Sequence, residues 1–212
     1  MLTYYIDRNA ACFWTMKNTL LLMAQTWRGT TTTTRMTSQS QDSVRFVGKE
    51  KFPTKVMVWV AICKCGISKP LIRRSKFDSV NSDIYIKESL EKRPLPFTRE
   101  HHPDSNYIFW PNLAGCHYSK QTVAWMDENV KFLPKDINPP NVPQARPIEN
   151  FWGCLAQKVY EGGWEAKTEQ QLIRRIKSKM KKFDKNFVES LLEGVKAKVK
   201  SIGDNGVYFL FK

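Results

Sequence analysis

The segments FWPNLAGCH at residues 109–117 and PIENFW at residues 147–152 decide how the fold of this sequence is interpreted. The first lies at the end of an apolar run, which predicts a buried strand that delivers the polar side chain of Asn112. The second follows a proline-rich stretch and predicts a helix whose first turn carries Glu149. A polar group at a strand end that faces a carboxylate at a helix start is a common arrangement in metal-dependent sites. The alternative is that Glu149 is a surface acid favoured by the helix dipole.

Both segments resemble catalytic motifs of mariner-like (Tc/mariner superfamily) transposases, and the resemblance extends over about residues 44–200. PIENFW is similar to the third motif of that family without a gap, whereas the second motif has Asp at the position of Asn112. The resemblance implies an RNase H-like DDE domain, in which three carboxylates bind two Mg²⁺ ions during DNA cleavage and strand transfer. It implies catalytic and metal-binding roles for Glu149 and, at the position of the second Asp, for Asn112.

This chain departs from the family pattern at two of the three catalytic carboxylates. Asn112 offers an amide oxygen without a charge, and the first Asp motif is absent from its expected place. Because the lost charges weaken a two-metal site, we expect Mg²⁺ binding to be weak or lost and the domain to be catalytically inactive. The alternative is a non-enzymatic nucleic-acid-binding or interaction protein that reuses the fold. An active nuclease with a rebuilt site needs replacement acids, for which Asp7 and Asp136 are the candidates.

Residues 1–43 differ from the rest of the chain, since they contain a threonine run and lack hydrophobic periodicity. One interpretation is a disordered, irregular extension. A second comes from the genetic code: read two bases downstream, the codons of residues 14–20 can spell Asp-Asp-Glu-x-Tyr-Phe, the family's first catalytic strand. Under this frameshift hypothesis, about residues 12–42 are translated out of frame and the sheet can lack its central strand. The nucleotide sequence tests the hypothesis, because codons that cannot spell the motif exclude it.

We expect an α/β domain with an RNase H-like mixed sheet flanked by helices at residues 44–165, followed by a basic helical C-terminal extension at residues 166–212. The apolar run Val56–Cys63 predicts a central strand that is covered on both faces and paired antiparallel with residues 68–73. Residues 106–110 predict a second core strand.

Further elements are expected around these strands. Asn81 and Ser119 are predicted N-caps of helices, because their side chains can accept hydrogen bonds from the first turn. Prolines predict a loop or broken helix at residues 93–105. The remaining expected elements are short strands at residues 44–46 and 130–134, and helices at residues 149–160, 171–182 and 186–202.

The charge of the chain indicates a polyanionic partner. A net charge of +14 and a pI near 9.6 favour nucleic acid, so DNA is the expected partner and the nucleus the expected location. The candidate phosphate contacts are the basic residues of one amphipathic helix: Arg174, Arg175, Lys177, Lys179, Lys181 and Lys182. The alternative for this helix is an ordinary solvated face. The family leaves a homodimer possible, and its paired DNA-reading helix-turn-helix domains, which precede the catalytic domain, are not expected in this polypeptide.

The cysteines predict neither a disulfide framework nor a zinc module. There are five of them, and the pair Cys63 and Cys65 has no matching second pair. Adjacent His101 and His102 lie in the proline-rich stretch, where solvated side chains are expected and a metal-ligand role is the alternative. A reduced, intracellular protein is the simplest interpretation, with no stretch that is long and apolar enough to span a membrane.

Overall fold

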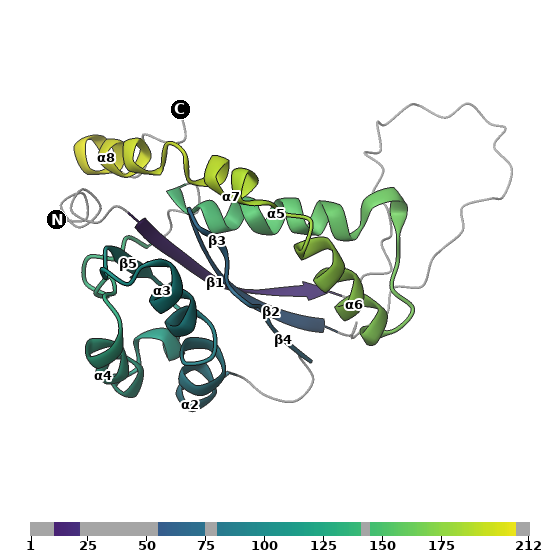
Figure 1. Ribbon diagram of the computed structural model, residues 1–212, viewed down its shortest axis with the longest axis horizontal. Helices are drawn as coiled ribbons and strands as arrows, with labels where there is room; N and C mark the ends of the chain where they lie inside the picture. The colour runs from purple at the N-terminus through teal and green to yellow at the C-terminus, as the bar shows by residue number, and fades with distance from the viewer. Residues whose placement is uncertain (1–10, 22–54, 75–79, 141–144, 207–212) are drawn as a thin grey trace, which may run out of the picture.

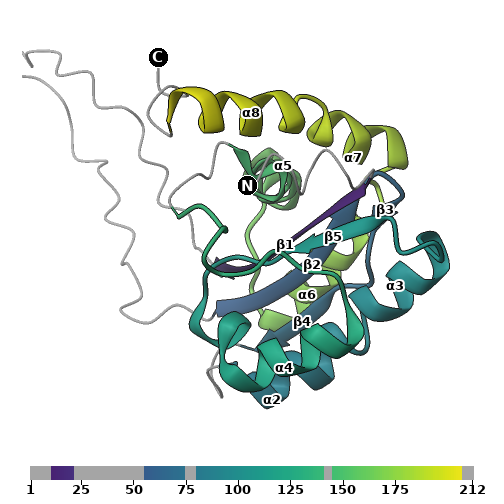
Figure 2. The same ribbon diagram turned by 90° about the vertical axis from the view of Figure 1, so that its left-hand side faces the viewer.

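A computed structural model describes residues 11–21, 55–74, 80–140 and 145–206; the strand expected at residues 44–46 lies outside these ranges. The described residues form one mixed sheet between two layers of helices (Figures 1 and 2). Its strands are β1 (Ala11–Leu21), β2 (Lys55–Cys63), β3 (Gly66–Ile67), β4 (Leu71–Arg74) and β5 (Tyr107–Trp110). The strand order is β3-β2-β1-β5, with β4 also paired to β2. The predicted α/β architecture is confirmed.

Strand β2 separates two hydrophobic cores, because successive side chains of a strand point to opposite faces. Val56, Val58, Val60 and Ile62 enter the core on one face. Met57, Trp59, Ala61 and Cys63 enter the core on the other face. All eight side chains are buried, so the prediction of a central strand covered on both faces is confirmed.

The chain turns sharply after β2 and returns along the same strand. Gly66 has a φ of +133°, a backbone conformation that L side chains rarely adopt, and it follows a two-residue turn. Both β3 and β4 then pair antiparallel with β2. The predicted antiparallel pairing of β2 with residues 68–73 is confirmed for the β4 part of that range.

Strand β1 occupies the centre of the sheet. It pairs antiparallel with β2 along most of its length, and parallel with β5 from Ala11 opposite Tyr107 to Trp14 opposite Trp110. Its sequence has few strand breakers, and pairing on both sides satisfies its backbone groups. The expectation that residues 1–43 are irregular and that the sheet lacks a central member is therefore wrong for residues 11–21.

One layer of helices follows the β4 strand. It contains α2 (Ser82–Ile84), which continues into the wider turns of η1 (Tyr85–Leu90), then α3 (Pro94–His101) and α4 (Lys120–Asn129). The predicted caps are confirmed: Asn81 Oδ1 accepts from the Ile84 amide at 2.9 Å, and Ser119 Oγ accepts from the Thr122 amide at 3.2 Å.

The loop or broken helix expected at residues 93–105 is instead largely helical. Pro94 and Pro96 lie in the first turn of α3, where a helix needs no amide donor, so these prolines start the helix rather than interrupt it. The strand expected at residues 130–134 is reduced to a single parallel bridge between Phe109 and Phe132. The Phe109 amide donates to Lys131 O and the Leu133 amide donates to Phe109 O.

The opposite layer contains α5 (Pro147–Val159), the short η4 (Glu161–Gly163), α6 (Glu169–Met180), α7 (Lys185–Leu192) and α8 (Val195–Asn205). Residues 186–202 do not form one helix, because Gly194 adopts a φ of +76° and separates α7 from α8. Buried side chains of α5, α6, α7 and α8 share one core with β2, so the boundary predicted at residue 166 falls within this core. No helix among the described residues is long and apolar enough to cross a membrane.

Candidate functional site

Asn112 lies just beyond the carboxyl end of β5, where the sequence places it. The four residues of β5 are buried, and Pro111 leads the chain out of the sheet. Asn112 Oδ1 accepts a hydrogen bond from the Ala114 amide at 3.2 Å, which fixes the side chain over the turn that follows. The Asn112 carbonyl oxygen lies 3.2 Å from Nδ1 of the buried His117. The amide oxygen that is predicted to coordinate metal thus also accepts a backbone hydrogen bond.

Asn138 ties the incoming loop to the same strand end. Its Oδ1 accepts from Trp110 Nε1 at 2.8 Å, and its Nδ2 donates to Pro111 O at 2.9 Å. The same Nδ2 donates to the Tyr118 hydroxyl at 2.8 Å. Burial raises the pKa of Tyr118 to about 12, so the neutral phenol can donate onward to Leu133 O. Sequence reasoning missed Asn138, since only the fold shows that this loop asparagine is buried.

Glu149 stands in the first turn of α5, as predicted, with Arg146 directly before the helix. Pro147 fits the first helical position because no amide donor is needed there. Partial burial raises the pKa of the Glu149 carboxyl, and the nearby Arg146 guanidinium opposes that rise. Arg146 is itself buried and donates to Pro139 O at 3.0 Å and to Asn138 Oδ1 at 3.3 Å. A hydrogen-bonded chain therefore connects the end of β5 to Arg146, three residues before Glu149.

The residues at this site do not fit a pair of magnesium ions. Two such ions need several charged oxygen ligands, whereas Glu149 is the one site carboxylate that the motifs supply, and the Arg146 cation offsets its charge. Asp136, a candidate replacement acid, is exposed, and Asp7 lies outside the described residues. Among described residues, three metal-ligating side chains meet at one place: Cys63, Cys65 and His102. This cluster lies toward the amino end of β5, whereas Asn112 follows its carboxyl end.

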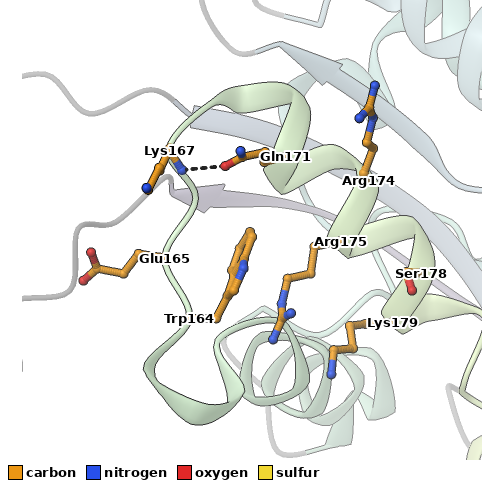
Figure 3. Close-up of a pocket in the computed structure, with 8 residues that line it drawn as sticks. All are labelled: Trp164, Glu165, Lys167, Gln171, Arg174, Arg175, Ser178 and Lys179. Carbon is orange, nitrogen blue, oxygen red and sulfur yellow. Dashed lines mark hydrogen bonds between the residues drawn. The ribbon is translucent and has the colours of Figure 1, made fainter.

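Two of the six predicted phosphate contacts are occupied within the protein. The Arg175 guanidinium donates to the carbonyl oxygens of Val159 and Glu161 and lies over the Trp164 ring, 4.4 Å from its centroid. Lys179 Nζ lies 2.7 Å from Glu161 Oε2, and 13% of its side chain is exposed. Figure 3 shows both side chains beside Trp164 in a pocket of about 540 Å³, whereas Arg174 points away from that ring. Arg175 and Lys179 therefore secure the end of α5.

The other four predicted contacts, Arg174, Lys177, Lys181 and Lys182, are exposed. Lys177 and Lys181 line a groove of about 730 Å³ between α6, the start of α7 and the loop that joins β3 to β4. Lys69, Arg93 and Lys185 add three further cations to the groove, and Asp184 is its acidic lining residue. A groove with this excess of cations suits the phosphates of a nucleic-acid backbone.

Solved structures of one protein share this fold. The chain is similar to a pre-cleavage Mos1 transpososome, with a TM-score of 0.70 and 12% identity over 93% of this chain and 56% of that one. It is similar to the Mos1 catalytic domain, with a TM-score of 0.60 and 14% identity over 73% of this chain and 76% of that one. The fold is that of a mariner transposase catalytic domain. The predicted resemblance and the RNase H-like fold class are confirmed.

The similarity to the Mos1 structures is low in sequence and covers part of their length. The chain spans a little more than half of the Mos1 chains in the complexes, for example 59% of the chain in the mariner Mos1 paired-end complex with Mg, where the identity is 11%. No protein-family model matches the sequence, and no curated protein matches it.

Proposed function

We propose that this chain derives from a mariner-like transposase whose ancestral chemistry was Mg²⁺-dependent DNA cleavage and strand transfer, and that it still binds DNA phosphates without cleaving them. One coincidence carries the proposal. The chain follows a Mos1 transpososome chain over 93% of its length, while Asn112 and Glu149 stand at the strand end and helix start where the motifs predict them. The Mos1 structures include a paired-end complex with a left transposon end and a paired-end complex with Mg, and binding of DNA and Mg²⁺ is a proposal for this chain.

Loss of cleavage follows from the charge at the site. A two-metal reaction needs carboxylates that cancel the charge of the ions, and Asn112 supplies none. Arg146 adds a positive charge close to the remaining acid, which further disfavours a cation there. We therefore assign Glu149 and Asn112 as remnants of the catalytic and metal-binding set, with Mg²⁺ binding weak or lost.

The register of β1 supports the frameshift hypothesis. Trp14 lies opposite Trp110, so extending the parallel register by two residues brings Met16 level with Asn112. The codons of Thr15 and Met16, read two bases downstream, are those that can spell the second Asp of the motif. The shifted frame would thus put an acid beside Asn112, as a catalytic pair requires. The nucleotide sequence of codons 12–43 tests this directly, and codons that cannot encode the motif would exclude it.

DNA binding without cleavage separates the main proposal from its rivals. Duplex DNA carrying a transposon terminal repeat is incubated with the full chain and Mg²⁺ or Mn²⁺, and both binding and nicking are measured. We expect salt-dependent binding and no nicks. Robust nicking that disappears in Glu149→Ala would overturn the proposed inactivity. A folded chain that does not bind would overturn the proposed DNA binding and leave only a relic of the transposase.

A charge-matched pair of variants locates the binding surface. Lys177→Ala with Lys181→Ala removes two groove cations, and should reduce the slope of log affinity against log salt by about 2. Lys196→Ala with Lys200→Ala removes two exposed cations of α8, outside the groove, and should change that slope much less. Equal effects of the two pairs would indicate a diffuse attraction, which favours the solvated-face alternative. Nuclear localisation and a homodimer are further proposals carried over from the family.

A further inference from the structure

Three side chains that are distant in sequence meet at the end of β2. Cys63 is the last residue of that strand, Cys65 lies in the turn to β3, and His102 follows α3. His102 Nε2 lies 3.7 Å from Cys63 Sγ and 3.5 Å from Cys65 Sγ. All three ligand atoms lie within 4.8 Å of one another. The cluster therefore offers two sulfurs and an imidazole nitrogen at one point.

We propose that Cys63, Cys65 and His102 bind a zinc ion, with solvent as the fourth ligand. Zinc prefers this combination of thiolate and imidazole ligands in a tetrahedral geometry. With Zn–S near 2.3 Å and Zn–N near 2.0–2.1 Å, a tetrahedron places sulfur and nitrogen about 3.5 Å apart. The two sulfur–nitrogen distances of 3.5 and 3.7 Å match that separation with little movement of the side chains.

Hydrogen bonding between thiol and imidazole explains the cluster less well. A neutral imidazole nitrogen carries either one hydrogen or one lone pair, so it makes one good hydrogen bond. Here two sulfurs approach the same Nε2. Convergence of three donor atoms on one point is the arrangement that a metal ion accounts for.

The turn between the cysteines is arranged to stabilise a thiolate. The Cys65 amide donates to Cys63 Sγ at 3.2 Å. A backbone donor of this kind favours the charged form of a sulfur ligand.

His102 is also suited to metal binding. Its Nε2, which lies 3.5 Å from Cys65 Sγ and 3.7 Å from Cys63 Sγ, is the ring nitrogen that would bind the ion. Its neighbour His101 differs, because the His101 ring packs edge-on against Phe97, with ring centroids 4.6 Å apart. The pair therefore supplies a ligand and a matched control within one segment.

A zinc ion here would join parts of the chain that are 39 residues apart. His102 leads into the amino end of β5, whereas Asn112 follows its carboxyl end, so the zinc site and the catalytic remnant lie at opposite ends of one strand. The zinc site is thus separate from the catalytic remnant, whereas Cys65 also lines the groove proposed for DNA, so metal binding is measured in the absence of DNA. Its role would be to fasten the β2–β3 hairpin to the segment between α3 and β5.

Cobalt titration of the reduced, metal-free full chain tests the proposal. We expect one equivalent of Co²⁺ to give a thiolate-to-cobalt charge-transfer band and the intense visible bands of a tetrahedral centre, and zinc to displace it. Cys65→Ser and His102→Ala should each weaken Co²⁺ binding at least tenfold. Cys154→Ser, which changes a partly buried cysteine of α5, and His101→Ala should bind like the parent chain.

Two further measurements keep the test decisive. Zinc should protect Cys63 and Cys65 from alkylation, and should raise the Tm of the parent chain by roughly 5–10 °C at a zinc concentration a hundred times Kd. Circular dichroism of each metal-free variant checks that it folds. A folded parent chain without the charge-transfer band would overturn the proposal, as would a band that Cys65→Ser and His102→Ala leave unchanged. A Cys63–Cys65 disulfide that forms in the presence of zinc would overturn it as well.

Discussion

Polar side chains gather at both ends of β5, and the two groups differ in what holds them. At the carboxyl end, Asn138 bridges Trp110, Pro111 and Tyr118 through buried hydrogen bonds. At the amino end, His102 and the two cysteines converge on one point and are only partly enclosed, with Cys63 alone fully buried. One group is kept in place by the protein itself, whereas the other has the composition of a site completed by a bound ion.

If position 112 held an acid in an ancestral chain, as we propose, this difference explains how the site could lose that charge and keep its shape. Asn138 and Arg146 satisfy buried donors and acceptors near Asn112. They are therefore needed for folding whether or not DNA is cleaved. The charge at position 112 has no such second use, because an amide oxygen accepts from Ala114 as a carboxylate would. Stability therefore preserves the loop, while only activity would preserve the acid.

The largest effect is expected from Asn138→Ala, which should lower the free energy of unfolding by about 3 kcal/mol. The substitution leaves Trp110 Nε1 and Pro111 O without the buried partners that Asn138 gives them. Urea denaturation measures the loss. Asn112→Ala is the matched control at the same strand end, and should cost less than about 1 kcal/mol, since its side chain makes one hydrogen bond in a partly buried turn. Similar losses for the two asparagines would contradict the distinction between fold and chemistry.

A smaller effect should separate the histidines at the two ends. His117 is buried and stacks on Tyr85 with ring centroids 4.1 Å apart, so His117→Ala should cost about 2–3 kcal/mol. His102→Ala should cost less than about 1 kcal/mol without metal, because His102 is partly exposed. Denaturation in the presence of a chelator measures both. A large loss from His102→Ala under those conditions would show that the imidazole is structural by itself.

The sequence predicted the elements with a strong local signal. The run of β-branched and aromatic residues in β2, the caps at Asn81 and Ser119, and the PIENFW helix are local patterns, and each appears where expected. Pairing across the sheet was harder to predict. The sequence of β1 has no clear alternation of polar and apolar residues. Its place between β2 and β5 depends on pairing with both neighbours rather than on its own composition.

The candidate sites also differ in whether their residues are local or distant in the sequence. Asn112 and Glu149 could be proposed from the sequence because each belongs to a contiguous motif. Cys63 and Cys65 carried a weak signal, a C-x-C pair, but its third ligand comes from a proline-rich segment 39 residues away. Arg175 and Lys179 show the opposite error: a basic helix predicts phosphate contacts, yet the fold uses these two side chains on the end of α5. Charge patterns reveal how many cations a helix has, and tertiary contacts decide which remain available.

The smallest effect is expected from replacing Glu149, the acid in the first turn of α5. Burial raises the pKa of Glu149 in the folded protein, so the folded state holds that proton more tightly than the unfolded chain does. The ionised carboxylate therefore costs stability above its folded pKa, and the cost is absent below the unfolded value of about 4.3. Glu149→Gln should stabilise the protein at pH 7 by less than about 1 kcal/mol, because solvent screens the half-buried group.

Denaturation of Glu149→Gln at pH 7 and near pH 4 measures this cost. The gain at pH 7 should shrink as the pH falls, since the parent carboxyl becomes protonated and neutral like the amide. Glu193→Gln, at an exposed acid after α7, is the control and should change stability little at either pH. A loss of stability at pH 7 would mean that attraction to Arg146 outweighs desolvation, and that Glu149 is now a structural partner of that arginine. A gain would mean that the ionised Glu149 carboxylate in the first turn of α5 costs the folded chain stability, as expected for the proposed remnant of a catalytic acid.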